Sequence, residues 1–156
     1  MRNTLLITTL LFGLTTAAQE ATWTTVQDIN LFIGTGGHGH THPSAQTPFG
    51  MIQLGPNTRY DGWDGCGGYH YTDSAMYGFS CTHLSGTGVS DYGDLLMLPY
   101  SSPTKEGDHI KFFKEDEHAQ AGYYACILDD GTRIEATAGD RTGILRILFG
   151  KGSEPG

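Results

Sequence analysis

The sequence has few basic residues. Its 9 Lys and Arg stand against 17 Asp and Glu, which gives a formal net charge of -8. A protein that binds nucleic acid needs a basic surface to neutralise phosphates, so we expect no nucleic-acid partner. A neutral or cationic ligand suits this charge better, and sugars are neutral.

Only one stretch of the chain is apolar over any length. Leu5–Leu14 follows Arg2 and precedes the small residues Thr16–Ala18. A basic start, a short apolar run and small residues are typical of a secretory signal peptide, whereas a membrane anchor needs roughly 20 apolar residues. We therefore predict a signal peptide at residues 1–18, a secreted or periplasmic protein, and no membrane span after the signal is removed.

Cysteine is also scarce. Cys66, Cys81 and Cys126 match no CxxC zinc or redox spacing, and three cysteines cannot all pair within one chain. Export permits a disulfide. The sequence does not choose between one bridge and three buried thiols.

Helical periodicity is missing after the apolar run, and short strand patterns take its place. The clearest is a hairpin, with Tyr123–Leu128 and Arg133–Ala138 joined by the turn Asp129–Thr132. Further strands are expected at Ile144–Phe149, Leu95–Leu98 and Ile110–Phe113. The fold class predicted is all-β, an antiparallel β-sandwich, with fewer strands than a large sandwich needs. We expect this sandwich to be incomplete.

Glycine, in contrast, is abundant. The chain has 23 glycines, roughly twice the usual share. Most of the excess lies between residues 34 and 93, interleaved with aromatic residues. This composition indicates tight turns and close backbone approaches rather than a flexible linker.

The first candidate site is the loop Gly34–His42, which contains Gly36, Gly37 and His38. Its histidines at positions 38, 40 and 42 could bind zinc, but no cysteine or acid nearby completes a tetrahedral set. The alternative is a tight turn whose backbone passes close to another group. A phosphate-binding loop would need the Gly-Lys-Ser/Thr signature, which is absent.

The second candidate is Tyr60–Tyr71, where Trp63 and Asp64 are adjacent and flanked by glycines. An indole ring can stack on the apolar face of a pyranose, and a carboxylate can accept hydrogen bonds from two neighbouring hydroxyls. The alternative is that Trp63 belongs to the core and Asp64 caps a turn.

The third candidate is Gly78–Asp94. Ser85 lies outside the G-x-S-x-G pattern of serine hydrolases, and His83 has no obvious nucleophile beside it, so His83 is expected to organise a loop. Asp91 and Asp94 are too few to form a calcium site of six to eight oxygens.

Taken together and in this order, these stretches resemble the N-terminal domain of glycoside hydrolase family 92. The motifs that carry the resemblance are Asn30–Thr41, Pro48–Arg59, Gly62–Asp64, Gly68–Tyr71, Thr82–Gly88, Asp91–Asp94, Ala121–Tyr124, Glu135–Thr137 and Arg141–Gly143. They cover roughly Val26 to Ile147. Several long motifs in the right order make the resemblance specific.

The resemblance implies a secreted, calcium-dependent α-mannosidase that trims N-linked glycans. Such enzymes pack an N-terminal β-sandwich, here residues 19–156, on a C-terminal helical (α/α) domain. The family inverts the anomeric centre with a carboxylic acid and a carboxylate that activates water. It places both groups, and most of the calcium ligands, in the helical domain. Accordingly, we expect no catalytic residue and no metal ligand in this chain.

The implied partners are mannose-containing glycans and that helical domain. Carried over by motif, the substrate-binding residues are Trp63, Asp64, Gly36, Gly37 and His38. The expected function is to form one wall of the mannose site, with no cleavage by this chain alone. Two alternatives stay open, a stand-alone carbohydrate-binding module and a zinc hydrolase built on the three histidines.

Overall fold

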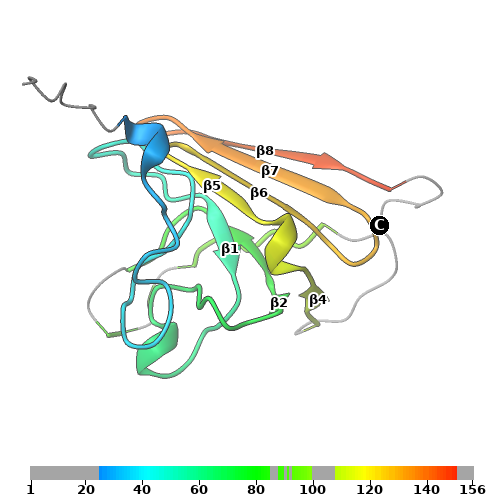
Figure 1. Cartoon of the computed structure of the whole chain (residues 1–156), viewed down its shortest axis with the longest axis horizontal. Coiled ribbons are helices and arrows are strands. Elements are labelled where there is room, and N and C mark those ends of the chain that lie inside the picture. The colour runs from blue at the N-terminus through cyan, green and yellow to red at the C-terminus, as the bar shows by residue number, and fades with distance from the viewer. Residues whose placement is uncertain (1–24, 85–87, 90, 92, 100–107, 151–156) are drawn as a thin grey trace, which may run out of the picture.

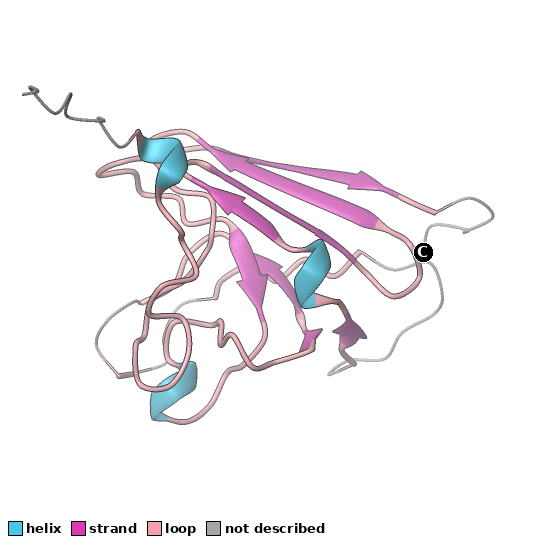
Figure 2. Ribbon diagram, in the orientation of Figure 1, coloured by secondary structure: helices cyan, strands magenta, loops and turns pink. Residues whose placement is uncertain are grey.

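The structure, a computed structural model, describes residues 25–84, 88–89, 91, 93–99 and 108–150. Within these ranges the regular elements are strands and three short 3-10 turns, and there is no α-helix (Figure 2). The prediction of an all-β, antiparallel fold is confirmed. The helical turns of the described residues are also too short to cross a membrane. The predicted signal peptide and Ser85 lie outside the described residues.

The most regular part is a four-stranded antiparallel sheet. Its strands lie in chain order as β5 (His118–Gln120), β6 (Tyr123–Ile127), β7 (Arg133–Ala138) and β8 (Gly143–Leu148) (Figure 1). The predicted hairpin is confirmed, because β6 and β7 pair from Tyr123↔Thr137 to Ile127↔Arg133. Its turn is closed by a hydrogen bond from the Thr132 N–H to the Asp130 carboxylate, at 2.8 Å.

A less regular layer of short ribbons and loops lies below this sheet (Figure 1). In it, β1 (Gly55–Asn57) pairs with β3 (Gly78–Ser80), and β2 (Ala75–Met76) pairs with β4 (Ile110–Lys111). The turns η1 (Val26–Asp28), η2 (Trp63–Gly65) and η3 (Lys114–Asp116) complete the described elements. One regular and one irregular layer make up the sandwich.

The hydrophobic core lies between the two layers. The sheet contributes Tyr124, Cys126, Ile134 and Ala136, and the other layer contributes Leu54, Phe79, Met76 and Phe112. The alternation predicted for Arg133–Ala138 is visible here, since Ile134 and Ala136 face the core. The all-β packing therefore rests on apolar side chains from both halves of the chain.

Two predicted strands differ from the structure. Leu95–Leu98 forms only a single bridge, between Met97 and Phe79, because Leu95 has a φ of 55° that breaks an extended strand. Ile110–Phe113 shortens to β4, and Phe112 makes one further bridge to Leu128.

The β1–β3 ribbon has an apolar face and a polar face. Phe79 points into the core, whereas Asn57 and Ser80 lie on the opposite face, where the Asn57 amide donates to the Ser80 hydroxyl at 2.8 Å. Ser44 lies on this polar face too, because a Cβ on Gly55 would collide with its side chain. The ribbon thus separates the core from a buried polar layer beneath the glycine-rich loops.

Candidate functional site

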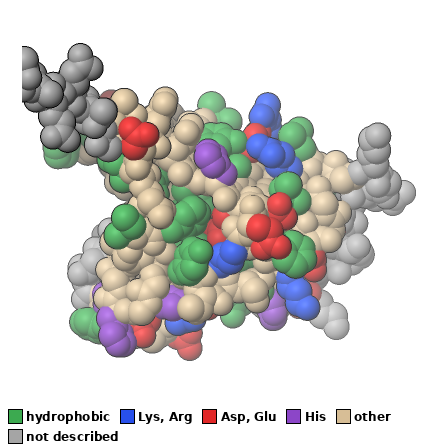
Figure 3. Space-filling view, viewed as in Figure 1, with side chains coloured by type: hydrophobic (Ala, Val, Ile, Leu, Met, Phe, Trp, Pro, Cys, Tyr) green, Lys and Arg blue, Asp and Glu red, His purple; other side chains and the backbone are tan. Residues whose placement is uncertain are grey.

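The structure brings together the two stretches that the sequence marks as sugar-binding. Asp64 lies in η2, and its carboxylate is 2.6 Å from His38 Nδ1 and 3.7 Å from His40 Nε2. On the face drawn in Figure 3, His and acidic side chains gather at the lower left edge, over η2 and the neighbouring loop. The pairing joins residues 26 positions apart in the sequence.

Trp63 is not a core residue. Its side chain is 61% exposed, and the edge of the His40 ring contacts it, with centroids 4.9 Å apart. The indole also packs on Gly88, where a Cβ would overlap the ring. Trp63 thus contacts both His40 and Gly88 and remains open to solvent.

The loop that carries His38 is shaped by glycine and held from behind. Gly37 has a φ of 57°, which favours glycine, and its carbonyl pairs with His70 Nε2 at 3.2 Å. The Tyr71 N–H donates to the Thr35 carbonyl at 2.9 Å. A Cβ on Gly36 would only touch Tyr71, at 3.5 Å. Residues 70 and 71 thus fix the position of Gly36, Gly37 and His38.

The electrostatics of Asp64 follow from its histidine neighbours. The hydrogen bond with His38 lowers the pKa of Asp64 below its ordinary value, and His40 acts in the same direction. The carboxylate therefore stays ionised, as an acceptor of hydroxyl hydrogen bonds should.

A buried polar cluster anchors this half of the molecule to the four-stranded sheet. Glu117, whose side chain is 1% exposed, accepts hydrogen bonds from Tyr69 at 3.0 Å, Tyr124 at 2.7 Å and Lys114 at 2.8 Å. Burial and the Glu117 charge raise the pKa of Tyr69, so this hydroxyl stays protonated and donates. Tyr69 in turn precedes the two residues that hold the Gly36–His38 loop.

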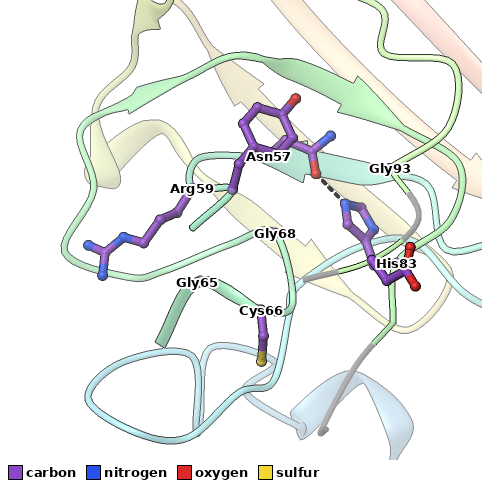
Figure 4. Close-up of a pocket in the computed structure, with 9 residues that line it drawn as sticks. Asn57, Arg59, Gly65, Cys66, Gly68, His83 and Gly93 are labelled. Atoms are coloured by element: carbon purple, nitrogen blue, oxygen red, sulfur yellow. Dashed lines mark hydrogen bonds between the residues drawn. The ribbon is translucent and has the colours of Figure 1, made fainter. Parts of the chain in front are cut away.

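Beside η2 lies a pocket of about 180 Å³ (Figure 4). It is lined by Asn57, Arg59, Tyr60, Gly65, Cys66, Gly68, His83, Asp91 and Gly93. Arg59 binds the Asp73 carboxylate through its guanidinium, and its stem packs so closely on Gly65 that a Cβ there would collide. The pocket thus shares the η2 turn with Trp63 and Asp64.

His83 lines this pocket and is held against the β1–β3 ribbon. Its Nε2 contacts the Asn57 side-chain oxygen (Figure 4). It also lies 3.0 Å from Ser80 Oγ. Burial lowers the pKa of His83 to about 4, so the ring is neutral. Gly68 permits this packing, because a Cβ there would meet both the imidazole and Asn57.

The three loop histidines are not brought to one point. His38 and His40 face Asp64, whereas His42 lines a separate hollow with Leu31, Ser44 and Phe49. Among the residues that the structure describes, no three His, Cys, Asp or Glu side chains are placed to hold one metal ion. Cys66, Cys81 and Cys126 are all free thiols.

Sequence reasoning missed several residues that build the site. Asn57 and Gly68 come from a ribbon and a turn that show no strand pattern, and the contact of Tyr69 with Glu117 spans 48 positions. The local signal that could have found them is the clustering of glycines beside Tyr69, since glycine marks close backbone approach. Nothing local points to Glu117.

Comparison with known proteins agrees with these findings. Residues 29–156 match the glycosyl hydrolase family 92 N-terminal domain. This match continues past Ile147, where the recognised motifs end. An uncharacterized secreted glycosidase of Arthroderma benhamiae is 29% identical over 131 residues, which cover 78% of this chain and 17% of that protein.

Solved structures give the same result. A family 92 α-mannosidase of Bacteroides thetaiotaomicron, in complex with mannoimidazole, is 38% identical with a TM-score of 0.75, covering 80% of this chain and 18% of that one. A second family 92 glycosyl hydrolase is 30% identical with a TM-score of 0.74, covering 84% and 20%. The chain thus spans at most a fifth of these relatives, and it belongs to glycoside hydrolase family 92, whose N-terminal domain it matches.

Proposed function

We propose that this chain forms one wall of the mannose-binding site of an exported α-mannosidase. The observation that carries the proposal is the exposed indole of Trp63 beside the ionised Asp64. A stacking surface and a carboxylate at adjacent positions suit a pyranose, whose one face is apolar and whose edge carries hydroxyls. The likeness to a mannosidase solved with mannoimidazole supports mannose as the sugar.

Each predicted residue has a role in this wall. Trp63 stacks on the sugar ring, and Asp64 accepts hydrogen bonds from its hydroxyls. His38 holds the Asp64 carboxylate in place through their 2.6 Å contact. Gly36 and Gly37 let the backbone approach the sugar closely. The space beside Gly37 is open, since a Cβ there would meet nothing within 4 Å. The wall binds and orients the sugar.

The proposal leaves turnover to groups outside the described residues. Inverting hydrolysis needs an acid and a base that flank the scissile bond with space for water between them. The family resemblance assigns both to a helical domain. It assigns most calcium ligands there too, and the described residues contain no metal-binding cluster. We therefore propose that any calcium is held elsewhere, and that the wall described above meets a helical partner domain across the glycan.

The test is mannoside binding by the full chain. Trp63→Ala should weaken the binding of methyl α-D-mannopyranoside about tenfold, which corresponds to ~1.4 kcal/mol, as measured by isothermal titration calorimetry. Single alanine changes at His38, His40 or His42 should weaken it less. Phe113→Ala is the matched control, because it removes an aromatic side chain that is 49% exposed and stands at the start of η3 rather than in η2. Equal affinities of wild type and Trp63→Ala would end the proposal.

A second measurement addresses turnover. Purified chain should bind the mannoside and release no mannose from p-nitrophenyl α-mannoside or from an oligomannoside. Mannose release that depends on Asp64 would show that the wall itself carries catalysis.

A further inference from the structure

Lys114, the first residue of η3, points its ammonium group into a set of aromatic rings. Its Nζ lies 4.6 Å from the centroid of the Tyr69 ring, 5.2 Å from that of Tyr71 and 4.5 Å from that of Phe112. All three distances fall within the ~6 Å at which a ring face attracts a cation. The same Nζ donates a hydrogen bond to the Tyr69 hydroxyl and pairs with Glu117, each at 2.8 Å. One lysine thus contacts both tyrosines.

A charged group at this position has a cost that an apolar side chain would not have. The Lys114 side chain is 25% exposed, and burial lowers its pKa, whereas its hydrogen bond with Glu117 acts in the opposite direction. A methionine could cover the same rings without removing a charge from water. The lysine adds direction, because its hydrogen bond and its attraction to ring faces orient Tyr69 and Tyr71.

The short segment that runs from one tyrosine to the other is joined at two points to the loop that carries His38. The Tyr71 N–H donates to the Thr35 carbonyl at 2.9 Å. His70 Nε2 lies 3.2 Å from the Gly37 carbonyl. A movement of this segment therefore moves the backbone on which His38 stands.

Phe32, at the start of that loop, contacts the same tyrosines. The centroid of its ring lies 6.4 Å from that of Tyr69 and 6.0 Å from that of Tyr71. The Phe32 carbonyl accepts hydrogen bonds from both the N–H and the hydroxyl of Thr35. Tyr71 is 47% exposed, so packing in the core does not fix its ring, which Lys114 and Phe32 contact. The orientation of Tyr71 thus depends on Lys114.

We propose that Lys114 is a positioning residue of the sugar-binding wall. It holds Tyr69 and Tyr71, these residues hold the loop, and His38 in that loop holds the Asp64 carboxylate. The inference rests on the proposed function, since the position of Asp64 matters for binding only if Asp64 contacts the sugar. The role requires a cation. Arginine should retain it, because a guanidinium also donates hydrogen bonds and stacks on ring faces, and methionine should not.

The experiment compares Lys114→Met with Lys114→Arg in the full chain. In ligand-free, 15N-labelled protein, Lys114→Met should shift the imidazole signal of His38, which is identified by its loss in His38→Gln. Lys114→Arg should return that signal toward its wild-type position. Calorimetry should show that Lys114→Met weakens the binding of methyl α-D-mannopyranoside about fivefold, because the wall is less well preorganised, and that Lys114→Arg restores most of the loss. Lys111→Met, the same change at an exposed lysine of β4, is the matched control and should alter neither.

The outcomes separate this inference from the proposed function. If the His38 signal in Lys114→Met matches that of the wild type, Lys114 does not position the loop, whatever Trp63→Ala does. The inference is also wrong if Trp63→Ala weakens binding and Lys114→Met does not, or if Lys114→Arg behaves like Lys114→Met. If Trp63→Ala has no effect but the His38 signal moves in Lys114→Met and returns in Lys114→Arg, Lys114 positions the loop and the proposed wall fails.

A second variant decides the matter if Lys114→Met does not fold. Tyr71→Ala removes the half-exposed ring that Lys114 contacts, and leaves Lys114 with Tyr69 and Glu117. It should shift the His38 signal in the same way. An unmoved signal in Tyr71→Ala would overturn the inference.

Discussion

The two layers of this molecule differ in how their positions are fixed. Strands β5 to β8 are joined by short turns and pair with their sequence neighbours. The glycine-rich layer is held by contacts between distant residues, such as Asp64 with His38 and Tyr69 with Glu117. Local sequence patterns specify the regular layer, whereas long-range contacts position the irregular layer, which carries the proposed sugar-binding residues.

The largest expected effect comes from cutting the link between the two layers. Glu117→Ala removes the carboxylate that binds Tyr69 from one layer and Tyr124 from the other, and leaves Lys114 without its ion pair. Removing one partner of a buried ion pair lowers the free energy of unfolding by about 3–5 kcal/mol. Urea unfolding of the full chain should show this loss. A loss below about 1 kcal/mol would mean that the layers hold together without Glu117.

That prediction also marks where the sequence stops being informative. The hairpin at Tyr123–Ala138 was predictable, because its alternation and its Asp-Asp-Gly turn are local. Trp63, Asp64 and His38 could be picked out as candidate binding residues, which stays a prediction, but the contact between Asp64 and His38 could not be predicted. The β1–β3 ribbon was not predicted. The sequence Gly55-Pro56-Asn57 is typical of a turn, and Pro56 has no N–H to donate to a neighbouring strand.

A hollow of about 550 Å³ that His83 also lines was equally impossible to predict from the sequence. Its floor combines Gln53 with Thr82, His83 and Asp94, which are nearly 30 positions or more further along the chain. No single segment contains enough of the lining to signal a pocket. Long-range contacts of this kind depend on tertiary packing, and periodicity says nothing about them.

The next effect concerns acid, to which the two layers should respond differently. Burial lowers the pKa of His42 and of His83 to about 4, and both lie in the irregular layer. In the unfolded chain both histidines have a pKa near 6.5. Between pH 6.5 and 4 they are therefore protonated in the unfolded state and neutral in the folded state, which favours unfolding. The free energy of unfolding is therefore highest above pH 6.5. It falls as the pH is lowered from 6.5 to 4, by up to roughly 3 kcal/mol for each histidine.

Unfolding in urea at pH 7.5 and at pH 5 measures this loss. In His42→Gln the loss should be smaller than in wild type, because one buried imidazole is gone. The pKa values of Asp64 and Glu135 are lowered by their hydrogen-bond partners, so their contribution to the free energy of unfolding is lost only at more acid pH. A wild-type stability that does not change between pH 7.5 and 5 would contradict the burial of both histidines.

A smaller effect compares two glycines with similar backbones in different surroundings. Gly131 in the hairpin turn has a φ of 82° and open space around it, whereas Gly88 has a φ of 74° and lies against the Trp63 ring. Gly131→Ala should cost about 1–2 kcal/mol from backbone strain alone. Gly88→Ala should cost the same strain and also displace the indole, which a shift of the Trp63 indole N–H signal would report. An unmoved signal in Gly88→Ala would show that Gly88 does not position Trp63.

The smallest expected effect on stability is at Trp63 itself. Its side chain is 61% exposed and has an aromatic contact with His40 and close packing on Gly88, so little of its apolar area is withdrawn from water. Trp63→Ala should change the free energy of unfolding by no more than about 0.5 kcal/mol, as surface substitutions usually do. Calorimetric melting of the variant and of Phe113→Ala, a second half-exposed aromatic, gives the comparison. A small loss would agree with the proposal that the exposed indole serves to contact a sugar rather than to stabilise the fold. A loss of 2 kcal/mol or more would instead make Trp63 part of the scaffold, and the distinction between the two layers would fail where it matters most.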